Sequence, residues 1–446
     1  MRFALSFAAA ALCGCASTAV QTPVNAPATG RIVEQAPPDV GRDVIFLSFS
    51  GGGARAASFS LGVLQQMRDT PARENGDLLD HVALITSVSG GSITAAYYGL
   101  HGPDGLDSFR AAYLDREWSG FHHTIISPLN WLRVYRGGMN SAESLAGALD
   151  ADIFAGARMS DLHGPQIWIN AAELHTETPF AFTPGYFEAL CSDPGSVRVA
   201  DAVAASMSVP LGFHPVTLES YADACREPLP RWVDDALADR AAPEMLRTTA
   251  LAFKAYRDPT RMRYLNLVDG GILDNFGLTS LNVMRRAAPT PYAPLGEREA
   301  AHLRRLLVLV VNAERTSPHD WPLDARGPSG GDTLGSSLDA WVDFSKRAAY
   351  DAFTATYQEW REDLVKWRCG LPPAEQQRLA IEPGWRCDDV SFTIDILSFA
   401  DLDEAAYGKL SVAPTAVRLD KDLIDALIEG GREALRRNPA AQALAR

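Results

Sequence analysis

The hydrophobic pattern along the chain predicts strands that alternate with helices. Short apolar runs typical of buried strands are mostly separated by longer stretches with the apolar spacing of a helix. These runs occupy residues 44–50, 82–88, 166–171, 264–268 and 306–311. Such an order indicates an α/β fold with a mainly parallel central sheet and helices on both faces. Because ligands of such sheets bind beyond the carboxyl ends of the strands, the residues that end each run are the first candidates for a site.

The second run ends at a turn that would expose a serine. HVALITSV (81–88) has a strand pattern and ITAAYYGL (93–100) a helical one, and Ser89, Gly90 and Gly91 lie between them. A serine on so tight a strand-to-helix turn has its hydroxyl at the positive N-terminal end of the helix. The segment matches the G-x-S-x-G nucleophile elbow, except that Ser87 replaces the first glycine. The sequence therefore predicts Ser89 as a nucleophile, with an ordinary turn as the alternative.

The first run opens into a glycine loop. Gly51, Gly52 and Gly53 precede a helical pattern, so their N–H groups are uncovered near a helix start and favour negative charge. The spacing of Gly51, Gly53 and Ala56 formally fits a dinucleotide fingerprint, but the second strand does not end in the acidic residue that this site needs. No Gly-Lys-Ser or Gly-Lys-Thr phosphate loop follows. An oxyanion hole for acyl transfer fits best, and no cofactor or metal is expected.

A later strand ends at a carboxylate. Asp269 closes the run 264–268 and is followed by Gly270 and Gly271, so its side chain should reach the same edge as Ser89 and could act as a base. The alternative is a solvated aspartate in a turn. Asp274 is a weaker candidate because the chain has left the strand before it.

Histidine is not the predicted base. Of the nine histidines, only His175 and His214 stand where they could line the site. His175 follows the strand at 166–171 by a few residues, and His214 lies in the proline-bounded segment VPLGFHPV. Neither belongs to a recognisable motif, so a Ser-His-Asp triad is not favoured.

Together these motifs resemble the patatin-like phospholipases. The resemblance rests on the glycine triplet with Arg55 nearby, the elbow at Ser89 and the Asp-Gly-Gly that begins at Asp269. The stretches 169–193, 199–218 and 414–438 also look like segments of bacterial members, so the likeness runs from about residue 43 to the C-terminus. Two positions depart from the family pattern: Ala56 and Ser87 stand where glycine is usual.

The resemblance implies a patatin-like α/β/α sandwich and a Ser-Asp dyad without a catalytic histidine. Carried over by position, Ser89 is the nucleophile and Asp269 the general base. Four backbone amides would stabilise the oxyanion, those of Gly51, Gly52, Gly53 and Gly90. Arg55 would either hold the loop or face a lipid phosphate. An ordinary aspartate is a weak base, so Asp269 would need desolvation to raise its pKa.

These roles predict a lipid acyl hydrolase that cleaves acyl esters through a covalent acyl-Ser89 intermediate. The expected partner is a lipid or another acyl ester. Two other classes stay open: a catalytically silent lipid-binding protein of the cell envelope, and a carboxylesterase or acyltransferase for non-lipid acyl groups. The oligomeric state is not predicted.

Length and charge narrow the partners further. The 446 residues, 47% of them hydrophobic, suit one large domain at 43–446 that includes a C-terminal helical extension. A formal net charge of -14 opposes attraction to phosphate backbones, so nucleic acid is excluded as a general partner.

Residues 1–15 have the pattern of a signal peptide for export. An apolar run after Arg2 ends in Leu-Cys-Gly-Cys, which resembles the bacterial lipobox with Cys15 as the lipidated residue. The alternative is an ordinary secretory signal cut near Ala16 or Ala19. Residues 16–42 are rich in Pro, Ala and Thr and are expected to form a disordered tether. We therefore expect an exported protein of the bacterial cell envelope, held at a membrane surface by its lipid anchor.

Four further cysteines suggest disulfides in an exported chain. Short loops favour Cys191 with Cys225 and Cys369 with Cys387, with free buried thiols as the alternative. Two other stretches carry no motif. Residues 118–138 form either a core helix and loop or a lipid-facing lid, and residues 332–360 have the pattern of an amphipathic helix.

Overall fold

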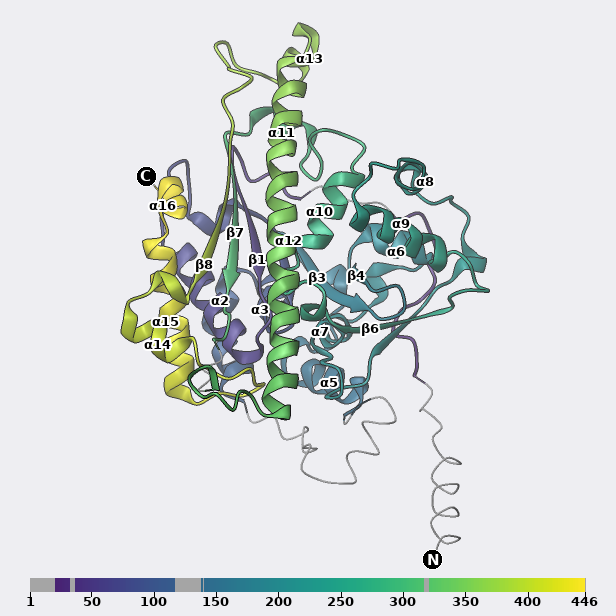
Figure 1. The fold of residues 1–446 in the computed structure, drawn as a ribbon. Coiled ribbons are helices and arrows are strands. Elements are labelled where there is room, and N and C mark those ends of the chain that lie inside the picture. Colours follow the sequence, from purple (N-terminus) through teal and green to yellow (C-terminus); the bar gives the residue numbers. More distant parts are fainter. Residues whose placement is uncertain (1–20, 33–36, 117–137, 139, 317–320, 446) are drawn as a thin grey trace, which may run out of the picture.

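A computed structural model describes residues 21–32, 37–116, 138, 140–316 and 321–445. Its centre is an eight-stranded sheet in the order β5-β6-β3-β2-β1-β7-β8, with β4 paired to β3 outside this path (Figure 1). The five strands β3-β2-β1-β7-β8, in this spatial order, are parallel to their neighbours. In contrast, β4 and β6 run antiparallel to β3, and β5 runs antiparallel to β6. The strands are β1 (Asp43–Phe49), β2 (Val82–Val88), β3 (Gln166–Glu173), β4 (Thr178–Ala181), β5 (Val216–Glu219), β6 (Tyr264–Asp269), β7 (Arg305–Asn312) and β8 (Ser391–Ser398).

All of the predicted apolar runs are strands of this sheet, and the sheet is mainly parallel as expected. The pattern missed β4, β5 and β8. The first two have only four residues each, and β8 is an edge strand in which only Phe392 and Leu397 are buried, so none has a continuous apolar run. β6 also departs from the expectation, because it enters the sheet against β3 rather than along it.

Apolar side chains cover both faces of the sheet. Ile45, Leu47 and Phe49 of β1 belong to one hydrophobic core, whereas the alternating Val44 and Phe46 belong to another. The first core includes residues of α2 (Gly53–Arg68), α3 (Gly90–His101), α7 (Val199–Met207) and α15 (Lys421–Arg437). The second includes α10 (Leu278–Ala287) and α12 (Gly330–Cys369), and Figure 1 shows α12 lying across that face. The fold is therefore the α/β/α sandwich expected from the sequence.

The remaining α-helices of the described chain lie around these layers. Their bounds are α5 (Ala142–Leu149), α6 (Pro184–Leu190), α8 (Arg231–Ala238), α9 (Glu244–Tyr256), α11 (Glu297–His302), α13 (Pro373–Arg378), α14 (Glu404–Leu410) and α16 (Pro439–Ala445). The amphipathic pattern at 332–360 falls within the long helix α12. Most of the stretch 118–138 lies outside the described residues.

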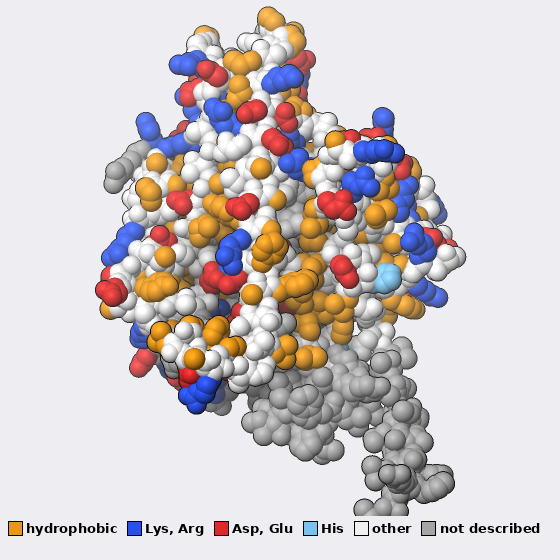
Figure 2. Space-filling model, in the orientation of Figure 1, with side chains coloured by type: hydrophobic (Ala, Val, Ile, Leu, Met, Phe, Trp, Pro, Cys, Tyr) orange, Lys and Arg blue, Asp and Glu red, His pale blue; other side chains and the backbone are white. Residues whose placement is uncertain are grey.

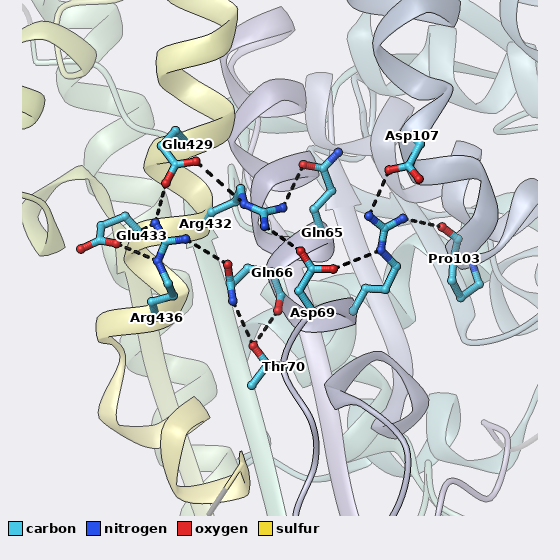
Figure 3. Close-up of polar contacts among 11 residues, drawn as sticks. Gln65, Gln66, Asp69, Thr70, Pro103, Asp107, Glu429, Arg432, Glu433 and Arg436 are labelled. Atoms are coloured by element: carbon cyan, nitrogen blue, oxygen red, sulfur yellow. Dashed lines mark hydrogen bonds and ion pairs between the residues drawn. The ribbon is translucent and has the colours of Figure 1, made fainter.

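Helix α15, near the C-terminus, is packed closely on α2. A Cβ atom at Gly62 would lie 2.8 Å from the carbonyl carbon of Ile428, so the two backbones touch where glycine leaves room. Polar contacts border this seam: Arg432 donates to Asp69 at 2.6 Å, and Arg436 donates to Gln66 at 3.2 Å (Figure 3). The predicted C-terminal extension is thus part of the layer that carries the glycine loop.

Part of the predicted tether is ordered against the domain. The Asn25 side chain is buried and donates to Ser192 Oγ at 2.8 Å and to the Glu219 carbonyl at 2.9 Å. The Val24 amide donates to the carbonyl of Thr217 in β5. The prediction of disorder over 16–42 is therefore wrong for this part of the segment. Its composition offers little apolar surface to bury, but these hydrogen bonds and the burial of Asn25 offset the conformational entropy that is lost on ordering. Cys15 and the signal segment lie outside the described residues.

Two disulfides join the cysteine pairs that short loops favoured, Cys191 with Cys225 and Cys369 with Cys387. Among the residues described here, no helix is both long enough and apolar enough to span a bilayer.

Candidate active site

Ser89 stands on a sharp turn between β2 and α3. Its φ of 50° and ψ of -122° place it in a conformation that residues other than glycine rarely adopt. The turn is crowded: a Cβ atom at Gly91 would lie 2.7 Å from the carbonyl oxygens of Phe49 and Ser50, and one at Gly90 would lie 2.7 Å from the Gly53 Cα. Small residues are therefore required after Ser89, and the turn has the form of a nucleophile elbow.

Ser87 fits where the family pattern has glycine. Its side chain is fully buried and donates to the Trp168 carbonyl on the neighbouring strand at 2.9 Å. The departure is accommodated by a hydrogen bond, so it leaves the turn intact.

Asp269 lies beside Ser89. The Ser89 hydroxyl donates to Asp269 Oδ2 at 2.8 Å, across 180 positions of sequence, and the Gly271 amide donates to Oδ1 at 2.8 Å. Burial raises the pKa of Asp269 from 3.8 to about 6, although the bonds from Gly271 and Ser89 act in the opposite direction. The carboxylate is thus oriented by one amide and desolvated, as a base needs to be.

Asp269 reaches this edge by a route that the sequence did not predict. The prediction assumed a strand parallel to β2, but β6 is antiparallel to β3 and pairs only with its last residues, Ala171 opposite Asp269. β3 extends past the end of β2, where Asn170 pairs with Val88. The carboxyl end of β6 therefore meets that of β2 even though the strands run in opposite directions.

The glycine loop is held open beside Ser89. Gly52 has φ 142° and Gly53 has φ 59°, values that favour glycine. A Cβ atom at Gly53 would lie 2.5 Å from the Ala416 carbonyl oxygen, and the Ala54 amide donates to the same oxygen at 2.8 Å. A segment before α15 therefore supports the loop, and it belongs to the stretch 414–438 that resembles bacterial members of the family.

Three of the four predicted oxyanion donors are free. Within the part of the chain that the structure describes, the N–H groups of Gly52, Gly53 and Gly90 make no hydrogen bond, as expected at the first turns of α2 and α3. The Gly51 amide donates to the Asn275 carbonyl at 3.2 Å. Gly51 is therefore corrected from a donor to a residue that ties the loop to the turn after Asp269.

Arg55 holds the loop rather than facing the site. Its buried guanidinium donates to the carbonyls of Ala313 at 2.7 Å and Ala413 at 2.6 Å. Burial lowers its pKa to about 10, with Arg315 acting in the same direction and Glu314 opposing it. The structural alternative is therefore the one observed.

The two candidate histidines lie elsewhere. His175 is exposed in the turn between β3 and β4, and the His214 amide donates to the carbonyl of Asn140 at 3.0 Å. Among the described residues, no histidine hydrogen bonds to Ser89 or Asp269. Asp274 is also buried, but its oxygens accept from the amides of Phe276 and Thr279 and shape the turn before α10.

Two site residues were missed by the sequence analysis. Ser206, at the end of α7, accepts from the Ser89 amide at 2.8 Å and donates to the Asn170 carbonyl at 2.6 Å. The Asn275 side chain lies against both Gly51 and Gly271. Each belongs to a segment distant from Ser89 in sequence, and a single serine or asparagine carries no periodic signal. In the described chain, no cluster of His, Cys, Asp and Glu is arranged to hold a metal ion.

Comparison with known proteins gives one family and a set of solved structures. The model of the patatin-like phospholipase family matches residues 47–282. Human GIVD cytosolic phospholipase A2 is 13% identical with a TM-score of 0.45, and the match covers 90% of this chain and 62% of that one. VipD from Legionella pneumophila is 12% identical with a TM-score of 0.34, over 95% of this chain and 71% of that one. A search of curated proteins found no match.

Proposed function

The chain belongs to the patatin-like phospholipase family, and we propose that it hydrolyses the acyl esters of lipids with Ser89 as nucleophile and Asp269 as base. The observation that carries the proposal is the 2.8 Å hydrogen bond from Ser89 Oγ to Asp269 Oδ2 beside the free amides of the glycine loop. Nucleophile, base and oxyanion donors are the parts that acyl transfer requires.

In the acylation step, Ser89 Oγ attacks the ester carbonyl while Asp269 accepts the hydroxyl proton. The amides of Gly52, Gly53 and Gly90 donate to the oxygen on which negative charge develops, and the N-terminal ends of two helices add their positive dipoles. The tetrahedral intermediate collapses, the C–O bond to the leaving alcohol breaks, and Asp269 returns the proton to that oxygen. Acyl-Ser89 remains.

In the deacylation step, water replaces the alcohol. The water oxygen attacks the acyl carbon while Asp269 takes a proton from the water. The same amides stabilise the second oxyanion. The bond from the acyl carbon to Ser89 Oγ then breaks, and Asp269 returns its proton to Ser89. The raised pKa of Asp269 suits this exchange, because a carboxyl group with a pKa of about 6 accepts and returns a proton near neutral pH more readily than an ordinary one.

A lipid substrate is supported by the apolar surface near the site. Val209 is 49% exposed and Leu211 61%, and they follow Ser208, whose carbonyl accepts from the Asp269 amide. Trp341 of α12 is 61% exposed, and its indole donates to the carbonyl of Ile272, three residues after Asp269. Figure 2 shows hydrophobic side chains gathered over the lower part of α12 and beside it. An acyl chain approaching Ser89 would meet this surface.

The test is hydrolysis of a phospholipid and of a nitrophenyl ester by purified protein. Ser89→Ala should lower kcat by at least about a thousandfold, because the covalent route is lost. Ser58→Ala is the matched control, since this buried hydroxyl of α2 has no hydrogen-bond partner, and it should leave the rate unchanged. Wild-type protein that binds lipid but hydrolyses neither ester would favour the silent lipid-binding class. Hydrolysis of the nitrophenyl ester alone would favour a non-lipid esterase.

Export to the cell envelope with a lipid anchor on Cys15 is a further part of the proposal. It is supported by the lipobox-like sequence and by two disulfides, which persist in oxidising compartments. Mass spectrometry of the mature protein should find a lipidated cysteine at its N-terminus, whereas an unmodified alanine there would remove the anchor.

A further inference from the structure

A cavity lies on the α10 face of the sheet, and its lining does not include Ser89. Its volume is about 380 Å³, within the range of small-molecule sites. Ser280, Val283, Met284 and Ala287 line it at positions i, i+3, i+4 and i+7 of α10, so one whole helix face borders the space. Aromatic side chains form much of the remaining wall.

These aromatic side chains come from four other elements. Trp168 projects from β3, Tyr186 from α6, Trp232 from α8 and Phe253 from α9. The lining includes neither Ser89 nor Asp269. Trp168 precedes Asn170 by two residues, about 7 Å along the strand, and Asn170 is the residue opposite the end of β2. The cavity is therefore distinct from the catalytic edge, although both border β3.

Two hydroxyl groups in this wall are buried beside each other. Tyr186 is 6% exposed and Ser280 1%, and apart from each other neither the phenol oxygen nor Ser280 Oγ has a hydrogen-bond partner. Burial raises the pKa of Tyr186 to about 12, although Ser280 lies near enough to act in the opposite direction. The phenol is therefore protonated and can donate. Buried polar groups are normally satisfied, and a pair of hydroxyls that have only each other leaves one O–H donor unused, so the pair points to a ligand oxygen in this apolar cavity.

The charges around the cavity indicate what kind of ligand fits. Its described lining contains no Lys or Arg, and its one carboxylate, Glu188, has a pKa raised chiefly by burial. Arg257 and Arg31 act on Glu188 from outside the lining, so an anionic head group would be buried beside this carboxylate with no Lys or Arg of the lining to pair with it, which is unfavourable. A neutral oxygen, as in an ester, ether or alcohol, can accept from the hydroxyl pair without that cost.

A larger, charged hollow borders the cavity. This hollow has a volume of about 860 Å³. Trp232 and residues 287–289 line both the hollow and the cavity, so the two spaces adjoin. Its wall is charged, with Arg285 paired to Asp363 and Arg286 to Glu359. A charged hollow thus lies next to the apolar cavity.

We propose that this cavity binds a neutral single-chain lipid, such as a monoacylglycerol, with a head-group oxygen accepting from the pair of Tyr186 and Ser280 and the chain against Trp168 and Phe253. The proposal does not depend on Ser89 being a nucleophile. It assigns the protein a lipid-binding site separate from the catalytic one.

The test uses a long-chain alkylglycerol ether that carries a diazirine, because an ether cannot be hydrolysed. Photo-crosslinking to the full-length protein and peptide mapping should find adducts in residues 183–188 and 280–295. Val283→Trp, which fills the cavity, should abolish them, whereas Leu251→Trp on the exposed face of α9 should not. Tyr186→Phe removes only the donor and should weaken binding about three- to tenfold.

Several results would overturn the proposal. Adducts confined to peptides around Ser89, or labelling that neither Val283→Trp nor Tyr186→Phe changes, would place the lipid elsewhere. If Val283→Trp does not fold, the Tyr186→Phe titration decides alone. Equal labelling by the fatty acid of the same chain length at neutral pH would overturn the neutral head group.

Discussion

β3 borders two different kinds of site, one around Asn170 and one around Trp168, two residues nearer its start; these are called its Asn170 end and its Trp168 end. At the Asn170 end, backbones touch: the elbow, the glycine loop and the turn after Asp269 approach so closely that a Cβ atom on Gly90, Gly91 or Gly53 would overlap a neighbour. At the Trp168 end, side chains enclose about 380 Å³ of space. A site made from backbone contacts requires glycine and so leaves a mark in the sequence, whereas a cavity walled by apolar side chains looks like any core.

The largest expected effect tests the chemistry of the first end. Asp269→Asn should lower kcat at least about a thousandfold, because the amide cannot accept the proton of Ser89. The same change should stabilise the fold above pH 6. The rise in pKa from 3.8 to about 6 means that the ionised carboxyl costs about 3 kcal/mol of folding free energy, which is absent below pH 4.

Urea unfolding at pH 8 and pH 4 measures this linkage. The native state binds the proton more tightly than the unfolded state, so wild-type stability falls as pH rises from 4 through 6, and the gain from Asp269→Asn should be confined to the higher pH. If wild type and Asp269→Asn differed in unfolding free energy by the same amount at pH 8 and pH 4, burial of the ionised carboxyl would not be the cause of the difference.

The second prediction compares the loss of stability when one carbon is added beside the active site with the loss when two carbons are added beside the cavity. Gly90→Ala should destabilise the protein by about 3 kcal/mol, because the new Cβ would lie 2.7 Å from the Gly53 Cα in a site that has no spare volume. Ala287→Val adds two carbons beside the cavity and should change stability by less than about 1 kcal/mol. Similar losses from both variants in thermal unfolding would show that the two ends are packed alike.

The third prediction concerns pH and rate. Because Asp269 must be deprotonated to act as base, kcat/KM should fall about tenfold per pH unit below its pKa of about 6 and be level above it. A stopped assay of ester hydrolysis from pH 4.5 to 8 measures the profile. A midpoint near 4 would mean that desolvation does not raise the basicity of this carboxyl in the working enzyme.

The smallest effect is expected from Ser206, which acts through Ser89. Ser206→Ala leaves the Ser89 amide without its acceptor and should lower kcat about five- to tenfold with KM unchanged, since the hydroxyl orients the elbow and does not touch substrate. Ser60→Ala, another buried hydroxyl without a partner, controls for the loss of a serine. An equal loss of kcat in Ser60→Ala would contradict a role of Ser206 in positioning Ser89.

The sequence predicted the parts of the fold and site that depend on local pattern. Continuous apolar runs identified the central strands, and glycines identified the elbow, the loop and the turn at Asp269. The short strands β4 and β5 carry no such pattern. The antiparallel course of β6 could not be read either, because pairing partners are a property of the whole chain.

The contacts that complete the site come from distant segments. Ser206 from α7, Asn275 after Asp269, and Ala413 and Ala416 before α15 have ordinary side chains or contribute only a carbonyl. The pairing of the Gly51 amide with Asn275 also depends on a contact between loops, which is why four oxyanion donors were predicted where three are free.

The central claim is that Asp269 activates Ser89. Labelling with an alkyl fluorophosphonate, followed by peptide mass spectrometry, tests it directly. The account predicts a single adduct on the peptide that contains Ser89, formed at least about a hundredfold more slowly in Asp269→Asn. An adduct on another serine, or the same rate in both proteins, would contradict it.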